Sequence, residues 1–509
     1  MLLSANLPAR LWGAESRTYY FIIVSLLLLG AALGGKELWT QEARWSDIVV
    51  NMLQTGDYFH PSLMGEAYYD KPLLSYWLMI AASWLTAGLD LISLRLPSML
   101  AGLLTVYCTV QLGSMWFNRS TGLLAGWLLV TCYFFIFWSR VASSDMLNVA
   151  GMMLAVLWYV KRPQPSFNHY LVFFIILAVT SLCKGLIGVV LPLLVIAPHL
   201  FMQQRWRAHI NLSIVIALIP AVLIYMLPFW LSSHMLANPS YEDSGLYLVF
   251  RENILRFFQP FDHQGPIYTY FLYLPIYGLP WTLLLFPALW SLRNRWSQLD
   301  ENTRWLLLAM GLLFIFFTLS GSRRSYYVLP LIPFAILFVA NWLQSHEKLQ
   351  QRVAVGVAGL VVTWLAVFAL LIPWYYSGGG LPAFANEIKK VAEQQRPWDE
   401  WQIVMLDADK KAPLYVHNDK PLHFEKAPEG NISSPVRLLV SWPVLINFSR
   451  DTIFVTNDKY SGTLDAMLLM VGYQRIDVPE TRGQQALGKK NKRSAVAYVP
   501  RDILKEKML

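Results

Sequence analysis

Residues 72–88, PLLSYWLMIAASWLTAG, decide how the rest of the chain crosses a membrane. The stretch is apolar, but it is shorter than the about 20 residues that a helix needs to span the hydrocarbon layer. If it were a span, every later loop would change side, and loops rich in Lys and Arg would face outward. Such residues normally stay in cytoplasmic loops. We therefore predict an interfacial or re-entrant helix at residues 72–88.

Eleven other apolar runs are predicted to span the membrane. They begin near Thr18, Leu94, Thr121, Asp145, Asn168, Leu186, His209, Ile267, Arg304, Tyr326 and Val353. The N-terminus is placed inside, as Arg10 and Arg17 indicate. The predicted cytoplasmic loops then hold Arg119, Lys161, Arg162, Arg205, Arg207, Arg293, Arg295, Lys348 and Arg352, with little acid. The sequence thus predicts an all-α polytopic membrane protein.

The overall composition supports this fold class. Of the 509 residues, 56% are hydrophobic and 14% charged, whereas soluble proteins carry about 25% charged residues. The net charge of +9 does not indicate nucleic-acid binding, because much of it lies in short loops. A basic run near the C-terminus is either a solvated loop or a contact with anionic lipid headgroups; it comprises Lys489, Lys490, Lys492 and Arg493.

The composition changes near Trp374, which predicts a membrane body at residues 1–374 and a globular tail at 375–509. The tail begins with the flexible Gly378-Gly379-Gly380. An amphipathic helix pattern, LPAFANEIKKVAEQQ, precedes strand-like runs WQIVMLDA, DTIFVTN and SAVAYVP. An odd number of spans places the tail outside. We predict a small extracytoplasmic α/β domain there.

Polar residues, most of them ionisable, gather in the loops predicted to lie outside, although charges near a bilayer are costly and therefore often functional. The long first outer loop, about residues 36–90, holds Glu37, Gln41, Glu42, Arg44, Asp47, Asp57, His60, Glu66, Asp70 and Lys71. Later outer loops add Arg140, Asp145, Lys184, Arg251, Glu252, Arg256, Asp262, His263, Arg323 and Arg324. Basic groups on the outer face oppose the positive-inside tendency, so they predict an anionic ligand such as a phosphate.

Several of these residues also have a structural reading. Lys184 between two apolar runs could be a snorkelling side chain, and Arg323 with Arg324 could mark a helix start. Glu42 and Asp145 come from different loops and could flank one site of glycosyl transfer. Alternatively, they could form structural ion pairs with Arg44 and Arg140. Aromatic residues beside the charged motifs could contact a phosphate or sugar; they are Tyr68, Tyr69, Tyr326 and Tyr327.

Sequence motifs along the membrane body resemble those of a known family. The most specific is TQEARWSDIVVNMLQTGDYFHPSLMGEAYYDKPLLSYW, residues 40–77. RVASSDML, CKGLIGVVLP, RENILRFFQPFDHQGP, GLPW and SGSRRSYYVLPLIPF follow in order. Together they resemble the bacterial lipid A aminoarabinose transferases. These enzymes belong to the C-type glycosyltransferases, which also include the protein O-mannosyltransferases.

The resemblance implies a fold with about 11–13 spans and an inverting transfer of a sugar from a polyprenyl-phosphate donor. It places the active site on the periplasmic side of the bacterial inner membrane. The residues that match donor-phosphate contacts are Arg44, Lys71, Lys184, Arg256 and Tyr327, to which the outer basic cluster adds Arg323. Glu42 and Asp145 match acidic residues and are the predicted catalytic pair. The predicted substrate-lining residues are Gln41, Tyr68, Tyr69 and Asp57.

The sequence departs from the family pattern at Gln41, where the family usually has the Asp that is credited with catalysis. An amide cannot act as a base. Either the acceptor is an anion that needs no base, or Glu42 or Asp145 acts as the base, or the chain is a diverged, inactive member. The expected acceptor is lipid A or another envelope glycolipid first, and a protein hydroxyl second.

The sequence identifies no certain cofactor and leaves a divalent metal open. Asp70 and His263 are the candidate ligands if a divalent metal takes part, but a solvated surface histidine is the alternative for His263. Asn253 stands about where some relatives have a partnering histidine, which argues against a metal. The other function considered is a transporter or flippase for a lipid-linked or anionic solute. Transporters tend to carry internal repeats and midplane charges, and neither is visible here.

Overall fold

The computed structural model describes residues 7–13, 18–69, 71–86, 88–162, 164–234, 265–293, 295–408, 410–417, 422–425, 442–445, 450–489 and 495–501. The chain divides into two compact units. Unit 1 comprises Met1–Leu33, Tyr69–Met79 and Arg95–Phe368. Unit 2 comprises Gly34–Tyr68, Ile80–Leu94 and Ala369–Leu509.

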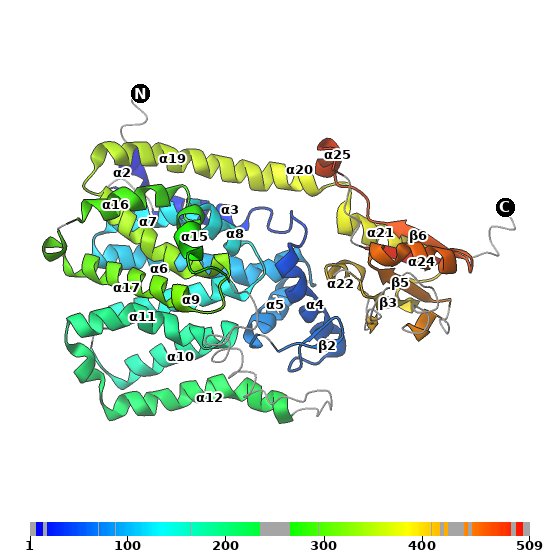
Figure 1. Ribbon diagram of the computed structural model, residues 1–509, viewed down its shortest axis with the longest axis horizontal. Helices are drawn as coiled ribbons and strands as arrows, with labels where there is room; N and C mark the ends of the chain where they lie inside the picture. The colour runs from blue at the N-terminus through cyan, green and yellow to red at the C-terminus, as the bar shows by residue number, and fades with distance from the viewer. Residues whose placement is uncertain are drawn as a thin grey trace. The chain divides into compact units, whose positions relative to one another are not determined.

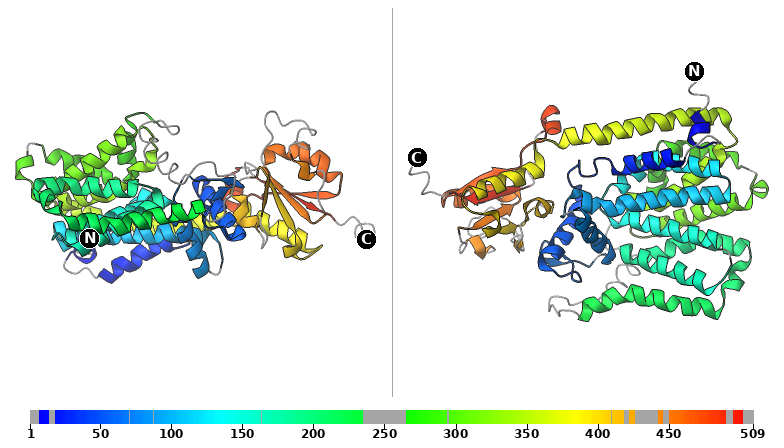
Figure 2. Two further views of the ribbon diagram at one scale, coloured as in Figure 1. Left: turned by 90° about the horizontal axis from the view of Figure 1, so that it is seen from below. Right: turned by 180° about the vertical axis from the view of Figure 1, so that it is seen from behind.

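Unit 1 is built from apolar helices that run side by side (Figures 1 and 2). In chain order they are α3 (Thr18–Gly30), α6 (Leu91–Trp116), α7 (Arg119–Thr131), α8 (Tyr133–Ser139), α9 (Ser144–Lys161), α10 (Phe167–Lys184), α11 (Ile187–Met202), α12 (Leu212–His234), α15 (Thr269–Tyr277), η3 (Trp281–Leu284), α16 (Leu285–Ser291), α17 (Glu301–Leu319), η5 (Ser325–Leu331), α18 (Ile332–Leu343) and α19 (Glu347–Ala366). A helix or a bent helix pair stands at each apolar run predicted to span the membrane. The predicted fold class is confirmed.

The helices differ in length and in hydropathy, the two properties that decide whether a helix can span a membrane. Within the described residues, six are long and apolar enough to be spans, and up to eight if each bent pair counts as one. The predicted count of eleven is higher for two reasons: α3 and α11 are apolar but shorter than 18 residues, and α9, with 18 residues, is not among the helices apolar enough to qualify. The helix at the deciding stretch, α5 (Leu74–Leu85), is also short. Its place at the membrane interface stays a prediction.

Two of the predicted single spans are sharply bent, which the sequence prediction missed. α7 and α8 meet at 71°, and α15 meets the η3–α16 segment at 111°. A break inside a membrane helix frees backbone groups that need partners. Here the breaks partner each other, because the Tyr133 N–H donates to the Leu279 carbonyl at 3.4 Å. The Trp281 indole N–H also donates to Thr131 Oγ1 at 3.0 Å.

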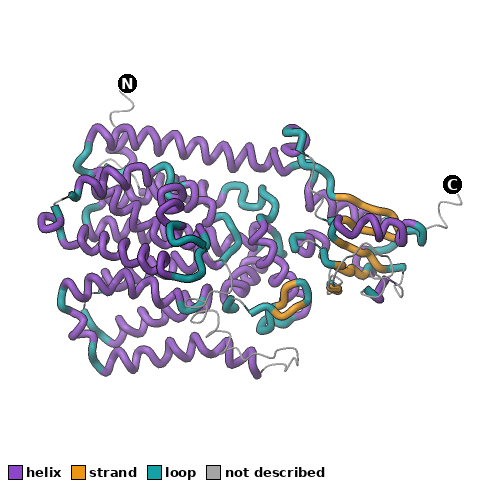
Figure 3. Tube along the Cα trace, in the orientation of Figure 1, coloured by secondary structure: helices purple, strands orange, loops and turns teal. Residues whose placement is uncertain are grey.

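Unit 2 contains the described strands, drawn orange in Figure 3. Its first part is α4 (Thr40–Thr55) followed by a small antiparallel hairpin, β1 (Ser62–Leu63) and β2 (Glu66–Ala67). The tail adds a five-stranded sheet in the order β4-β3-β5-β7-β6. Its elements are α20 (Ile372–Tyr376), α21 (Gly380–Glu393), β3 (Gln402–Leu406), α22 (Ala412–Val416), β4 (His423–Glu425), β5 (Thr452–Thr456), α24 (Ser461–Leu464), η10 (Asp465–Leu469), β6 (Tyr473–Asp477), α25 (Arg482–Ala486) and β7 (Val496–Pro500).

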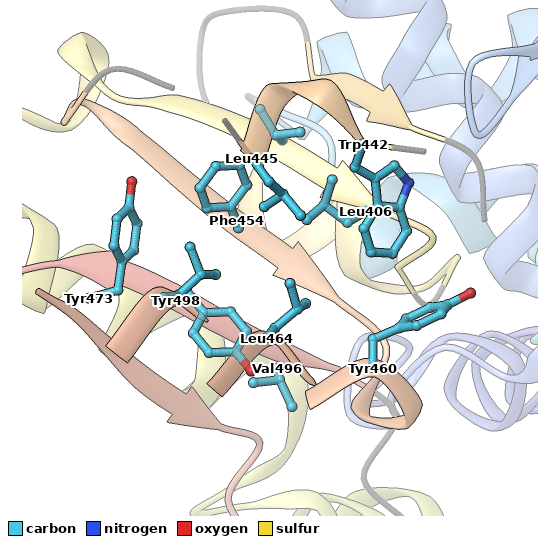
Figure 4. Close-up of a cluster of buried hydrophobic side chains, with 11 residues drawn as sticks. Leu406, Trp442, Leu445, Phe454, Tyr460, Leu464, Tyr473, Val496 and Tyr498 are labelled. Carbon is cyan, nitrogen blue, oxygen red and sulfur yellow. The ribbon is translucent and has the colours of Figure 1, made fainter. Parts of the chain in front are cut away.

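The sheet is mixed, and its middle strands are buried. β3 runs parallel to β4 and β5, while β7 runs antiparallel to β5 and β6. All five residues of β5 and of β7 are buried, as expected for strands covered on both faces. Figure 4 shows the aromatic part of this core, where Phe454, Tyr473 and Tyr498 lie among aliphatic side chains. The three predicted strand runs and the predicted helix correspond to β3, β5, β7 and α21, so the α/β tail is confirmed.

Candidate active site

An ion pair joins the ends of two neighbouring helices in unit 1. Ser143 caps α9 by accepting the Asp145 N–H at 3.2 Å, which places Asp145 in the first helical turn. Lys184 is the last residue of α10 and is paired with the Asp145 carboxylate. Each charge sits at the helix end whose dipole favours it. The Lys184 and Asp145 side chains are only 15% and 11% exposed, so little water screens the pair.

The Lys184 ammonium also lies near an aromatic ring. The Lys184 ammonium lies 5.4 Å from the centroid of Tyr327, within the range of a cation–π contact. Tyr327 follows Tyr326, whose ring packs 4.6 Å from that of Trp138. Asp145, Lys184 and Tyr327, which were predicted from three separate loops, are therefore gathered in one place.

The C-terminal end of α10 is also hydrogen-bonded to α5, shortly after the predicted donor-phosphate contact Lys71. Ser75 Oγ, in α5, donates to the Cys183 carbonyl of α10 at 2.9 Å. Lys71 and Tyr69 belong to the same short piece of unit 1, Tyr69–Met79, and both are half-buried. Asp70 lies outside the described residues, as do Arg256 and His263.

Arg140 does not form the predicted alternative pair with Asp145. Its guanidinium instead donates to backbone carbonyls at the end of α3, including Leu29 at 2.9 Å and Ala31 at 2.7 Å. The guanidinium also lies 3.9 Å from the ring centroid of Phe368. The last carbonyls of a helix lack partners within it, and Arg140 supplies donors to them. We interpret Arg140 as a structural cap of α3.

Arg323 also donates hydrogen bonds to backbone carbonyls. Its Nε–H donates to the Thr318 carbonyl at 3.0 Å and its Nη1–H to the Gly265 carbonyl at 2.7 Å. The neighbouring Arg324 donates to the Tyr326 hydroxyl at 2.9 Å. The Arg323 contacts hold two loop segments together, and they occupy part of the guanidinium that was predicted to bind phosphate.

Several predicted site residues of the first outer loop lie in the first turns of α4, in unit 2. Glu42 is 1% exposed; its Oε2 accepts the Trp39 N–H at 2.8 Å, and its own N–H donates to the Trp39 carbonyl at 2.8 Å. Gln41 is half-buried beside it. One turn on, Arg44 donates to the Tyr68 hydroxyl at 2.7 Å. The predicted alternative for Glu42, an ion pair with Arg44, stays a prediction.

Asp57 forms a turn after α4. Its Oδ1 accepts the Phe59 N–H at 3.0 Å and the His60 N–H at 3.1 Å. The carboxylate also lies 2.8 Å from the His60 ring nitrogen Nδ1. Such a side-chain-to-backbone pattern is typical of a turn-forming aspartate. Asp57 therefore shapes the chain between α4 and the hairpin.

Asp47 is a residue that the sequence prediction named in the outer loop but did not select. It is 1% exposed, and its Oδ2 accepts the Met64 N–H of the hairpin at 2.6 Å. Its Oδ1 is buried without a hydrogen-bond partner. Burial raises the pKa of Asp47 from its ordinary 3.8 to about 7, against the opposing effects of the Met64 N–H and the charge of Lys410. Its position three residues after Arg44, on one helix face, was the available signal.

Metal binding receives no support from the described part of the chain, in which no group of three His, Cys, Asp or Glu side chains gathers. Cys108, Cys132 and Cys183 are free and buried. Neither of the candidate ligands, Asp70 and His263, is among the described residues.

Comparison with known proteins gives a consistent result. Residues 70–231 match the family model of the dolichyl-phosphate-mannose-protein mannosyltransferases. Two curated relatives are the undecaprenyl phosphate-alpha-4-amino-4-deoxy-L-arabinose arabinosyl transferases of Shewanella sediminis and Pseudomonas aeruginosa. They are 26% and 27% identical, each over 85% of this chain and 77% or 75% of their own length. The resemblance inferred from the motifs is thereby confirmed.

Solved structures establish the fold. The structure of ArnT from Cupriavidus metallidurans bound to undecaprenyl phosphate matches with a TM-score of 0.69 and 18% identity, covering 94% of this chain and 97% of that one. The archaeal oligosaccharyltransferase AglB from Archaeoglobus fulgidus matches with a TM-score of 0.52 and 10% identity, covering 91% and 74%. The chain is thus a multi-span membrane protein with a C-type glycosyltransferase fold.

Proposed function

We propose that the chain transfers a sugar, with inversion, from a polyprenyl-phosphate donor to an acceptor of the bacterial envelope. Lipid A or another glycolipid is the preferred acceptor, ahead of a protein hydroxyl. The proposed location is the inner membrane, with the active site and the tail on the periplasmic side. The names of the curated relatives, which specify an undecaprenyl-phosphate donor, support this choice of donor.

The observation that carries the proposal is the sheltered Lys184–Asp145 pair beside Tyr327. In an inverting transfer, the acceptor oxygen bonds to the anomeric carbon as the bond from that carbon to the donor phosphate breaks. Negative charge then grows on the departing polyprenyl phosphate. An ammonium held in a poorly hydrated place stabilises such charge strongly. In this proposal Lys184 binds the phosphate, and Asp145 orients Lys184.

We also propose roles for the other residues that were predicted to contact the phosphate of the sugar donor. Lys71 and Tyr327 are proposed to contact the same phosphate as Lys184, and Arg256 keeps the role that its motif implies. Arg323 is proposed to shape the loop at Gly265, because two of its N–H groups already serve carbonyls. No cofactor is needed for this transfer.

Gln41 favours an anionic acceptor. A phosphate of lipid A is already ionised near neutral pH, so its attack requires no base, whereas a hydroxyl acceptor would have to lose a proton. Glu42 is the carboxylate that lies nearest to Gln41 in the sequence. Its Oε2 already accepts a hydrogen bond from the Trp39 N–H at the start of α4. We therefore propose that Glu42 stabilises the N-terminal end of α4.

Replacing Glu42 by Gln tests this assignment. Glutamine also offers an oxygen to the Trp39 N–H, so we expect Glu42→Gln to lower kcat by less than about ten-fold. Loss of a general base typically costs about 10²–10⁴-fold. The measurement is kcat with donor and lipid A in detergent, with the exposed Glu387→Gln as the control. A loss above about 100-fold would assign the base role to Glu42.

The proposed function itself is tested with the purified full chain in detergent. We expect transfer of the sugar from undecaprenyl-phosphate aminoarabinose to lipid A, detected by mass spectrometry. In cells, envelope lipids with and without the gene should differ by the mass of one sugar. Movement of solute across proteoliposomes without any sugar transfer would instead favour a transporter.

A further inference from the structure

Part of the first outer loop folds together with the tail, through hydrogen bonds between residues that lie 344 and 368 positions apart in the sequence. Gly34–Tyr68 and Ala369–Leu509 belong to one compact unit. Helix α4 packs against α22 of the tail, and the two lie side by side in Figure 1. Gln54, near the end of α4, accepts the Leu422 N–H at 3.2 Å. Glu37 Oε1 accepts the Leu381 N–H at the start of α21 at 2.9 Å.

The hairpin β1–β2 contacts two other segments of unit 2. In α4, Asp47 accepts the Met64 N–H and Arg44 donates to the Tyr68 hydroxyl. In the tail, Phe424 of the edge strand β4 lies next to Gly65. A Cβ placed on Gly65 would stand 3.0 Å from the Cβ of Phe424, so the two backbones meet closely. Gly65 has φ +79°, a conformation that glycine adopts without strain.

We propose that the tail is a positioning domain, in which Phe424 and α22 hold the hairpin and α4 in the geometry that binds the sugar donor. The inference rests on the proposed function, since the motif match assigns Arg44 to the donor phosphate and Tyr68 is predicted to line the substrate site. Phe424 and Gly65 are positioning residues in this account. Removing the Phe424 ring would loosen the hairpin and misplace Tyr68, which follows β2 directly.

Kinetic constants separate positioning from general stability. We expect Phe424→Ala to raise the KM for undecaprenyl-phosphate aminoarabinose about ten-fold with little change in kcat, because small misplacements weaken binding. Phe424→Leu should restore most of the affinity by refilling the space. Leu469→Ala, which removes an exposed apolar side chain from the same tail, is the control. If Phe424→Ala and Leu469→Ala gave the same KM as the wild type, the inference would be overturned.

A glycine pair provides a matched second test. Gly65 and Gly488 both have a positive φ, at +79° and +61°, but a Cβ on Gly488 meets nothing within 4 Å. Alanine at either position causes backbone strain, and only Gly65→Ala also presses on Phe424. We expect the KM to rise about ten-fold for Gly65→Ala and to stay near the wild-type value for Gly488→Ala. Equal KM values for the two variants would contradict the contact with Phe424.

Docking is also measurable without any activity. Cysteines at positions 65 and 424 of the full chain would need to move apart only slightly to reach the usual disulfide Cβ separation of about 3.8 Å. We expect Gly65→Cys with Phe424→Cys to cross-link on mild oxidation, seen as a disulfide-linked peptide by mass spectrometry, and each single variant to give none. Absence of the cross-link would sink the inference. A cross-link in the double variant, together with no sugar transfer by the wild-type chain, would keep the docking and reject the proposed function.

Discussion

Lys184→Ala is expected to lower kcat/KM for sugar transfer by about 10²–10³-fold, the loss typical of removing one donor aimed at developing negative charge. Two effects act together. The departing phosphate loses its ammonium partner, and Asp145 is left as a charge with little access to water. Transfer from undecaprenyl-phosphate aminoarabinose, measured in detergent with the full chain, gives the constants. Lys389→Ala is the control, because Lys389 pairs with Glu393 on an exposed helix face.

A double variant distinguishes the two effects. If Lys184 only neutralised Asp145, then Lys184→Ala with Asp145→Asn would recover most of the activity, because the unpaired charge is gone. If Lys184 binds the donor phosphate, the double variant stays as inactive as Lys184→Ala. We expect the second result. Recovery of activity would reduce the pair to a structural ion pair and would remove the main support for the proposed phosphate site.

The features that could be predicted from sequence are those encoded locally. Long apolar runs and basic loops predicted the helix positions, and short strand-like runs predicted β3, β5 and β7. The bends of α7–α8 and α15–α16 were missed, since they depend on contacts between the two breaks. The Tyr133 N–H finds the Leu279 carbonyl, and nothing in either segment alone reveals its partner.

The candidate site shows the same limit. Sequence motifs selected Asp145 and Lys184 separately, but the pairing is a property of how α9 packs on α10. The alternative that paired Arg140 with Asp145 was wrong, because a guanidinium that caps carbonyls looks the same in sequence as one that binds a carboxylate. The docking of the hairpin on Phe424 joins two distant segments, and neither carries a pattern that predicts the other.

The stability of unit 2 is expected to fall as the pH rises from about 4 to about 7, and Asp47 is the reason. Its pKa is about 7 in the folded chain and its ordinary value is 3.8. A carboxyl whose folded pKa is raised favours the folded state when protonated, so its support is complete below pH 3.8 and is lost as the pH approaches 7. This difference in pKa between the unfolded and the folded chain corresponds to at most about 4 kcal/mol of folding stability.

Asp47→Asn separates this contribution from all others. Asparagine keeps an oxygen for the Met64 N–H but cannot ionise, so the variant should lose less stability than the wild type between pH 4 and 7. Thermal unfolding of the full chain in detergent, followed across this range, measures the difference. Asp465→Asn is the control, since its carboxylate already pairs with Arg475 at 2.6 Å. If Asp47→Asn and the wild type showed parallel pH profiles, the Asp47 carboxyl would not be the titrating group. The hairpin would then be held by Arg44 and Phe424, without help from a protonated Asp47.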